Sequence, residues 1–382
     1  IMDYSIKLPT QSHYLKIYFR KKLFMENEIK EILLNLLHVN YKKKFINEKN
    51  IRSILIKKDR VEISIELNFP IRLLSEKFKV VIENSLKDIV KLPLEIKLTQ
   101  KIKSHQAQKG ISLIDGVKNV IAVASGKGGV GKSSTAVNLA LALLNEGAKV
   151  GILDADIYGP SQPQMLGINQ KPESKDGKSM EPIIAHGLQV MSIGFLVDQE
   201  TPMIWRGPMV TSTLEQLLKE TNWSNLDYLI IDLPPGTGDI QLTLAQKIPV
   251  TGAIIVTTPQ DIALLDARRG LKMFEKVNVP IIGVVENMTT HICSNCGHEE
   301  HIFGQGGGDR MSTDYNTLLL GSLPLDISIR EHLDNGAPSV STDPNTKISK
   351  IYQSIAQKVA YKVSELTVDL SSKFPKIVIK ND

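Results

Sequence analysis

The chain has 382 residues, of which 42% are hydrophobic and 23% are charged, and its formal net charge is +5. This length is enough for one large α/β domain and a second, smaller one. The composition is that of a globular protein, and no apolar run approaches the length that a membrane-spanning helix needs. Because the chain has only two cysteines, Cys293 and Cys296, it is not a secreted scaffold held together by disulfides.

The charge is distributed unevenly along the chain. Residues 1–110 hold 23 Lys and Arg against 12 Asp and Glu, a net charge of +11, whereas the later residues hold 23 against 29, a net charge of −6. A basic segment of this kind is a weak signal for nucleic acid, an anionic membrane or an acidic protein. It is more often the solvated face of a small domain.

Residues 1–24 are predicted to be a disordered N-terminal extension. The apolar run Tyr14–Phe24 is interrupted by four basic residues. These charges make the run unsuitable as the core of a signal peptide, so we expect a cytoplasmic protein.

Residues 25–99 are predicted to form a small α+β domain. Apolar residues first recur at helical spacing, two strands joined by a polar turn near Asp59 follow, and a second helix and a third strand complete the pattern. These elements are expected at residues 26–39, 51–57, 61–67, 71–90 and 94–98. No cysteine and no cluster of His or acidic residues occurs here, so we assign no chemistry to this domain. Polar residues 100–118 are predicted to be a linker.

The strongest motif is Gly126–Ser133, with the sequence Gly-Lys-Gly-Gly-Val-Gly-Lys-Ser, which we call the P-loop. A strand-like run precedes it and an amphipathic helical run follows, which is the context that a phosphate-binding loop requires. Glycines let backbone N–H groups turn onto phosphate oxygens, and the helix start adds its positive dipole end. Lys132 is expected to reach the β and γ phosphates of ATP, and Ser133 to hold Mg²⁺. The predicted nucleotide-binding residues are Gly126, Lys127, Gly128, Gly129, Val130, Gly131, Lys132, Ser133 and Ser134.

Two later apolar strands end in carboxylates, first Asp154 and Asp156 and then Asp232. Ligands of open α/β sheets bind at the carboxyl ends of the strands. One acid of the first pair is expected to position the attacking water or to take part in Mg²⁺ coordination, and we assign this catalytic role to Asp156; the alternative is a capping aspartate. Asp232 has the position of a Walker-B carboxylate that orders Mg²⁺, and Pro234–Asp239 is suited to a switch segment.

Residues 119–366 are predicted to form a P-loop domain, with residues 367–382 as a polar tail. Further strands are expected at residues 188–193, 251–257 and 280–286, and a helix at residues 262–276. The alternation of strands and helices predicts an α/β fold with a doubly wound, mostly parallel sheet.

The second candidate site is the pair Cys293 and Cys296 with its intervening residues, which we call the cysteine clip. This spacing lets both thiolates face one ion, but two thiolates leave a tetrahedral site incomplete. Either a histidine of the same chain completes a zinc site, or a second copy of the loop supplies the missing thiolates across a dimer axis. A redox dithiol is a third interpretation, although the loop does not open a helix. The candidate histidines are His291, His298 and His301.

Together these motifs resemble the Mrp (ApbC) iron–sulfur cluster carrier ATPases, which have a deviant P-loop and belong to the ParA/MinD-like superfamily. The resemblance covers about residues 110–340 in order. It rests on Ser125–Ser134, Asp154–Ser161, Trp205–Pro208, Asp232–Asp239, Val285–Met288 and the cysteine clip before Phe303-Gly304. Residues 25–99 resemble, more weakly, the assembly-factor domain often fused ahead of this ATPase.

The resemblance implies an ATP-binding and slowly hydrolysing homodimer. It implies that Cys293 and Cys296 of both subunits bridge a [4Fe–4S] cluster, which passes to apo iron–sulfur proteins and involves a cluster assembly scaffold. It further implies that Lys127 reaches the phosphates bound by the partner subunit and that Asn287 contacts the adenine. Nucleotide would set how the two protomers pack, and hydrolysis would be coupled to cluster loading or release.

Two other classes of ATPase share these motifs. A positioning ATPase of the ParA or MinD type, with a structural zinc clip, would need a basic amphipathic anchor. Residues 348–366 carry mixed charges and the tail from Thr367 is short and polar, so we expect no nucleic-acid and no membrane partner. An electron-transfer ATPase similar to the nitrogenase iron protein also bridges a cluster, but one Cys-x-x-Cys loop fits a labile carrier site better than two separated ligands.

Overall fold

The structure is a computed structural model that describes residues 11–38, 43–108, 111–196, 207–293 and 295–369. The chain divides into two compact units, residues 1–101 and 102–382, which are described one at a time. Three parts of the sequence-based predictions lie outside the described residues. They are Trp205 and Arg206 of the Trp205–Pro208 motif, residues 1–10 of the extension and residues 370–382 of the tail. Among those described, no helix is both long and apolar enough to cross a membrane.

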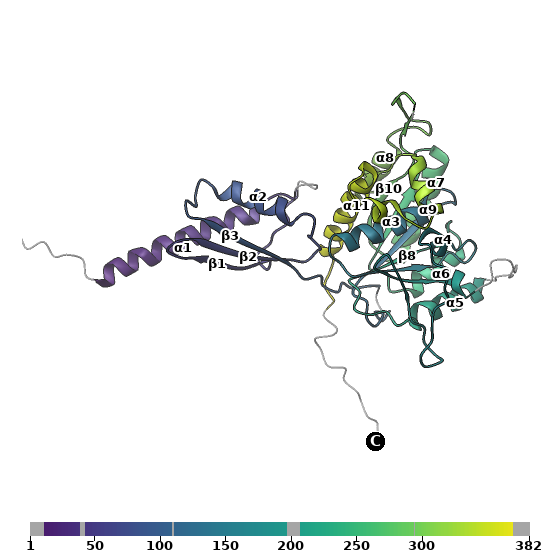
Figure 1. The fold of residues 1–382 in the computed structure, drawn as a ribbon, viewed down its shortest axis with the longest axis horizontal. Coiled ribbons are helices and arrows are strands. Elements are labelled where there is room, and N and C mark those ends of the chain that lie inside the picture. The colour runs from purple at the N-terminus through teal and green to yellow at the C-terminus, as the bar shows by residue number, and fades with distance from the viewer. Residues whose placement is uncertain (1–10, 39–42, 109–110, 197–206, 294, 370–382) are drawn as a thin grey trace, which may run out of the picture. The chain divides into compact units, whose positions relative to one another are not determined.

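The first unit packs two helices on a three-stranded sheet (Figure 1). Antiparallel pairing joins the first two strands in a hairpin, and a helical crossover makes the third strand parallel to the second. Side chains along the central strand alternate between buried and half-buried, because successive residues of a strand point to opposite faces. The elements are α1 (Gln11–Asn35), β1 (Ile51–Ile56), β2 (Val61–Leu67), α2 (Ser75–Leu86) and β3 (Leu94–Gln100).

Helix α1 corrects one prediction. Residues 1–24 were expected to be disordered and the first helix to begin at residue 26, but α1 is already helical at Gln11. The whole run from Gln11 to Asn35 lacks proline and glycine and is rich in strong helix formers such as Leu, Lys, Glu and Met. Its second half is anchored by Ile29 and Leu33, which are completely buried in the core of the unit.

The second unit contains an eight-stranded sheet in the order β13-β10-β9-β4-β8-β5-β7-β6. All neighbouring strands are parallel except β6, which is an antiparallel edge strand, so the predicted doubly wound, mostly parallel sheet is confirmed. The strands are β4 (Val120–Ser125), β5 (Val150–Asp154), β6 (Ile183–Ala185), β7 (Leu188–Ser192), β8 (Tyr228–Asp232), β9 (Gly252–Thr257), β10 (Ile281–Glu286) and β13 (Leu319–Ser322).

Helices cover the sheet, and every residue of β4, β5, β8 and β9 is buried. Continuous apolar runs are expected of parallel strands that are covered on both faces. Helix α3 packs against α11, and α7 packs on β9 and β4. The helices are α3 (Lys132–Asn145), α4 (Gln162–Met165), α5 (Gly207–Lys219), α6 (Asp239–Lys247), α7 (Asp261–Lys276), α8 (Gly307–Asp314), α9 (Ile327–Asp334), α10 (Ser339–Thr342) and α11 (Lys347–Ser364), with a 3₁₀ turn at Ile193–Phe195.

Residues 102–108, which were predicted to lie in a linker, are packed on the second unit. His105 is buried beside Asn119, whose Oδ1 lies 2.8 Å from His105 Nδ1. Gln108 donates a hydrogen bond to the carbonyl of Ala245 at 2.6 Å and accepts one from the N–H of Val250 at 3.0 Å. His105 also pairs with Val368 in an antiparallel bridge. These residues were predicted to be a linker, but they bind the body of the second unit because it offers them hydrogen-bond partners.

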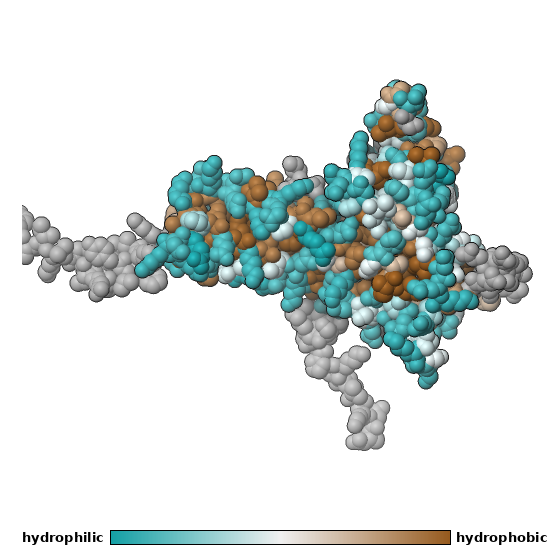
Figure 2. All heavy atoms as spheres, viewed as in Figure 1, coloured by the Kyte–Doolittle hydropathy of each residue, from teal (hydrophilic) through white to brown (hydrophobic). Residues whose placement is uncertain are grey.

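Figure 2 shows hydrophobic side chains scattered among hydrophilic ones on the surfaces of both units. Leu73 and Val80 are exposed in the first unit, as are Ile262 and Leu265 in the second. Scattered exposed apolar residues are normal on globular proteins.

The order of the strands brings the predicted site residues close together. β4 lies between β9 and β8, and β8 lies between β4 and β5. In register, Asp154 at the end of β5 pairs with Asp232 at the end of β8, which lies beside the strand that leads into the P-loop. The two carboxylate-bearing strand ends and the P-loop therefore meet at one edge of the sheet.

Candidate nucleotide site and cysteine clip

Two P-loop glycines are required by close contacts with neighbouring elements. A Cβ atom on Gly126 would lie 2.3 Å from the carbonyl carbon of Asp266 in α7. Gly131 has a φ of +83°, and a Cβ there would lie 2.1 Å from Nδ2 of Asn287. The loop backbone is thus held tightly between α7 and the segment that follows β10, while Gly128 and Gly129 are exposed.

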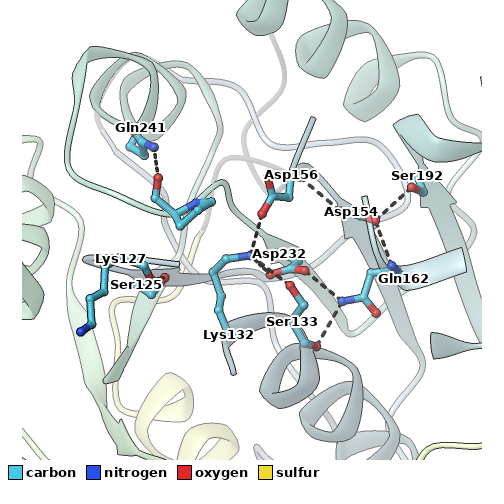
Figure 3. A network of polar contacts seen from close by, with 11 residues as sticks. Ser125, Lys127, Lys132, Ser133, Asp154, Asp156, Gln162, Ser192, Asp232 and Gln241 are labelled. Carbon is cyan, nitrogen blue, oxygen red and sulfur yellow. Dashed lines mark hydrogen bonds and ion pairs between the residues drawn. The ribbon is translucent and has the colours of Figure 1, made fainter. Parts of the chain in front are cut away.

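Lys132 is the centre of a charged cluster (Figure 3). Its ammonium contacts Oδ1 of Asp232 and lies 3.5 Å from Oδ2 of Asp156 and 3.2 Å from Oγ of Ser133. The lysine is only 5% exposed and Asp232 is fully buried. Burial lowers the pKa of Lys132, but Asp232 and then Asp156 outweigh it and raise the pKa overall, so this lysine stays protonated. The four residues predicted for phosphate, magnesium and water therefore lie together.

Asp154 at the end of β5 and Asp156 two residues later have different surroundings. Asp154 is fully buried and accepts hydrogen bonds from the N–H of Gln162 at 3.0 Å, the N–H of Asp156 at 3.2 Å and Oγ of Ser192 at 3.1 Å. Burial, followed by the charge of Asp232, raises the pKa of Asp154 to about 7. Burial also raises the pKa of Asp156, although Lys132 opposes the shift. Asp154 is thus engaged by protein groups, whereas Asp156 faces the lysine; its catalytic role stays a prediction.

Gln162 belongs to the site although the sequence did not suggest it. Its side-chain Nε2 donates to the carbonyl of Ser133 at 3.1 Å and to Oδ2 of Asp232 at 2.9 Å. A glutamine between two prolines in a loop has the sequence signature of a solvent-exposed turn. Only the position of α4 beside the P-loop shows that it is buried.

Asn287 lies behind the P-loop. Its Nδ2 donates to the carbonyl of Val130 at 3.0 Å, and its Oδ1 accepts from the N–H of Met288 at 2.9 Å. The side chain therefore fixes the loop backbone, and its predicted contact with adenine stays a prediction. Because the side chain of Val130 is buried, this residue offers a ligand only its backbone. Ser134, the last predicted nucleotide-binding residue, is half-buried.

Lys127 does not join the cluster of its own chain. It is half-buried, and Figure 3 shows its side chain directed away from Lys132. Its carbonyl accepts a hydrogen bond from Oγ of Ser125 at 2.9 Å, which fixes the backbone at the start of the loop.

The predicted switch segment, Pro234–Asp239, is tied to the end of β4. The N–H of Gly236 donates to the carbonyl of Ser125 at 2.9 Å, and Nε2 of Gln241 contacts the carbonyl of Pro235. The segment therefore lies next to the P-loop, as a switch that senses phosphate must.

The cysteine clip lies in a small hairpin formed by β11 (His291–Ile292) and β12 (Glu299–Glu300). The N–H of Cys293 donates to the carbonyl of His298, and the N–H of Gly297 donates to the carbonyl of Cys293, both at 2.9 Å. Cys296 is exposed and Cys293 is partly exposed. The backbone N–H groups of Cys296 and Asn295 lower the pKa of the Cys293 thiol, which favours the thiolate that binds metal.

The histidines near the clip do not complete a metal site. Across the described residues, no group of three or more His, Cys, Asp or Glu side chains is placed to hold a metal ion. His301 Nδ1 lies 2.8 Å from the carbonyl of Thr289, and His291 Nδ1 lies 3.5 Å from the carbonyl of Leu325. The one-chain zinc site that the sequence left open is therefore not formed in the part of the chain that the structure describes.

A family model described as "NUBPL iron-transfer P-loop NTPase", of the ParA type, matches residues 116–360. The chain belongs to this NUBPL family. The iron-sulfur cluster carrier protein of Pseudomonas fragi is 61% identical over 264 residues, covering 69% of this chain and 92% of that protein. The protein of the same name from Haemophilus influenzae is 50% identical over 337 residues, covering 88% of this chain and 91% of that protein.

A solved structure has a similar fold over part of this chain. The nucleotide-binding protein of Archaeoglobus fulgidus, in complex with ADP, is 37% identical with a TM-score of 0.52, covering 58% of this chain and 88% of that one. The NUBPL match includes the P-loop, the carboxylate cluster and the cysteine clip. The Haemophilus influenzae match is longer than the second unit, so it also includes part of the first.

Proposed function

We propose that this chain is an ATP-binding and hydrolysing carrier that holds a [4Fe–4S] cluster as cargo between two copies and transfers it to apo-proteins. The observation that carries the proposal is the cysteine clip. Its two thiols lie in one accessible hairpin with half of a tetrahedral ligand set, in a chain whose relatives are named iron-sulfur cluster carrier proteins. A half site that is exposed and easily reached suits a cluster that must be received and released.

The nucleotide half of the proposal rests on the Lys132 cluster. The Ser133 hydroxyl and the Asp232 carboxylate would hold Mg²⁺, since oxygen donors are the ligands that this ion prefers. When bound, Mg²⁺ neutralises charge on the phosphates. Phosphate oxygens would compete with Asp232 and Asp156 for the Lys132 ammonium, and Asp156, released from the lysine, would orient the attacking water.

Hydrolysis and cargo would be coupled through the segment that follows β10. Asn287 holds the P-loop at Val130, and six residues later the same segment reaches Cys293. Between them Thr289 donates to the carbonyl of Leu323 through both its N–H and its hydroxyl. A change in the P-loop backbone would therefore move one end of a short, well-anchored connection whose other end carries the clip. We propose slow hydrolysis that is coupled in this way to cluster loading or release.

The second copy would complete both sites. Lys127, directed away from its own cluster, would reach the phosphates bound by the partner subunit, and the partner's clip would supply two further thiolates. We propose apo iron–sulfur proteins and a cluster assembly scaffold as the other partners, without nucleic acid or membrane, and a cytoplasmic location.

Iron and acid-labile sulfide, measured on protein reconstituted without oxygen, test the cargo. We expect about four iron and four sulfide per dimer in the wild type, as a bridging cluster requires, and none in Cys293→Ala. Stoichiometric zinc without a cluster would contradict the proposal and favour a positioning ATPase with a zinc clip. Lys132→Ala tests the coupling, because cluster transfer to an acceptor that persisted without hydrolysis would show the two to be independent.

A further inference from the structure

Gln162 links three parts of the nucleotide site (Figure 3). Its Nε2 donates to the P-loop at the carbonyl of Ser133 and to Oδ2 of Asp232 on β8. Its backbone N–H donates to Oδ2 of Asp154, and Oδ1 of the same carboxylate accepts the N–H of Asp156. One residue thereby joins the proposed magnesium ligands to the backbone of the proposed catalytic aspartate.

The rest of the Gln162 side chain is unfavourably placed. The residue is fully buried, and its Oε1 has no hydrogen-bond partner within the described ranges of the chain. A buried amide oxygen without a partner costs free energy that an apolar side chain of the same size would avoid. Filling space is therefore a poor reason for glutamine at this position, whereas the two hydrogen bonds donated by Nε2 need an amide.

One of these two hydrogen bonds orients Asp232. Lys132 contacts Oδ1 of this carboxylate and Gln162 donates to Oδ2, so each oxygen has a separate protein partner. If phosphate drew Lys132 away, the Gln162 contact would still fix the plane of the carboxylate relative to Ser133. A carboxylate held in this way needs little reorganisation during the reaction.

We propose that Gln162 is a positioning residue for ATP hydrolysis, which holds Asp232 and the P-loop at Ser133 in one arrangement and, through Asp154, sets the backbone of Asp156. The inference rests on the proposed ATPase function and deepens it. Gln162 itself does not touch the reacting atoms in this role. Its effect is on the ligands of Mg²⁺ and on the placement of the residue that orients water.

Two substitutions at Gln162 test this role, with Gln164→Glu as the matched control, because Gln164 is exposed on the same short helix. Gln162→Met keeps the volume and removes the donor. Gln162→Glu keeps the shape and places a carboxylate against the two acceptors at Ser133 and Asp232. Hydrolysis is measured against ATP and against Mg²⁺, and the affinity for a fluorescent ATP analogue is measured with Mg²⁺ and with EDTA.

We expect Gln162→Met to lower kcat by about tenfold, the factor that matches one hydrogen bond to a charged group, and to leave KM nearly unchanged. Gln162→Glu should lower kcat further. In both variants the analogue should bind as in the wild type in EDTA, but Mg²⁺ should tighten its binding less. Gln164→Glu should match the wild type in every measurement.

Wild-type kcat and wild-type Mg²⁺ dependence in both Gln162 variants would overturn the inference. So would a loss of activity in Gln162→Met that only follows a loss of folded protein in thermal unfolding, because that residue would then serve packing. If the wild type and Gln164→Glu hydrolyse no ATP, the proposed ATPase function fails instead. The Mg²⁺ dependence of analogue binding still tests Gln162 in that case.

Discussion

The nucleotide site and the cysteine clip differ in how much of each site one chain supplies. At the first, Lys132, Ser133, Asp156 and Asp232 meet at buried strand ends, and protein hydrogen bonds hold them. At the second, two thiols lie in an accessible two-stranded hairpin without further ligands among the described residues. Burial gives the first site a fixed geometry, and exposure leaves the second open to a partner. A substitution should therefore act through rigidity at one site and through ligand supply at the other.

The largest effect is expected at Lys132. Replacing it by alanine leaves Asp232 and Asp156 buried without their cation. Breaking a buried ion pair in this way lowers the free energy of unfolding by about 3–5 kcal/mol. We expect no measurable ATP hydrolysis and a lower midpoint of urea unfolding, whereas Lys132→Arg should keep most of the stability. An unfolding midpoint for Lys132→Ala equal to that of the wild type would show that the cluster is less tightly coupled than its burial indicates.

A smaller effect is expected from replacing Gly131. The size of that effect shows how rigid the P-loop is. Gly131→Ala combines a positive φ with a Cβ that would lie 2.1 Å from Asn287 Nδ2, whereas Gly129 has a similar φ of +79° and no neighbour within 4 Å of its Cβ. Backbone strain alone costs about 1–3 kcal/mol. We therefore expect Gly131→Ala to weaken binding of an ATP analogue more than Gly129→Ala. Equal losses in the two variants would mean that the contact with Asn287 does not constrain the loop.

The pH dependence of stability tests the environment of Asp154. Burial and the charge of Asp232 raise its pKa to about 7, above its value of about 4 in the unfolded chain. The folded state thus holds this proton more tightly, so the stabilisation is complete below about pH 4 and is lost as the pH rises through 7. Asp154→Asn has no such proton, and its free energy of unfolding should fall less between pH 5 and 8, by up to about 1.4 kcal/mol per pH unit. Parallel urea-unfolding profiles for the two proteins would contradict this expectation.

The smallest effect is expected from replacing a residue near the cysteine clip that is not one of its two cysteines. His298 is exposed, and surface substitutions of this kind change stability by less than about 0.5 kcal/mol. His298→Ala should therefore reconstitute with the same iron and sulfide as the wild type and unfold at the same temperature. Loss of iron in this variant would mean that a histidine joins the ligand set, and the clip would be more complete in one chain than we propose.

Much of the second unit was predictable because its strands are covered on both faces. The buried apolar runs at β4, β5, β8 and β9 are visible in the sequence, and the residues at their carboxyl ends are chemically distinctive. The short edge strands β6 and β13 were missed, because runs of three and four residues carry little periodicity.

The parts that the sequence did not reveal depend on contacts between distant segments. Gln162 becomes a site residue only because α4 lies against the P-loop. Asn287 was expected as an adenine contact from the resemblance, but its hydrogen bond to the Val130 carbonyl depends on where the end of β10 lies. The composition of residues 102–108 predicts a linker. Only the structure shows their hydrogen-bond partners at Asn119, Ala245 and Val250. The early start of α1 is a different case. The domain pattern was expected to begin at residue 25, but the strong helix formers before it extend the helix back to Gln11.

The pairing of His105 with Val368 has a consequence for engineering. Gln106 donates its N–H to the carbonyl of Thr367, and Asp369 donates its N–H to the carbonyl of Ser104, so residues 104–106 and 367–369 run side by side. Chain segments that lie this close together allow another domain to be attached at either one. A gene in which the first unit follows residue 369 instead of preceding residue 104 would attach it at the same place on the second unit. Such a rearranged chain would show whether the role of the first unit depends on its preceding the second unit in the sequence.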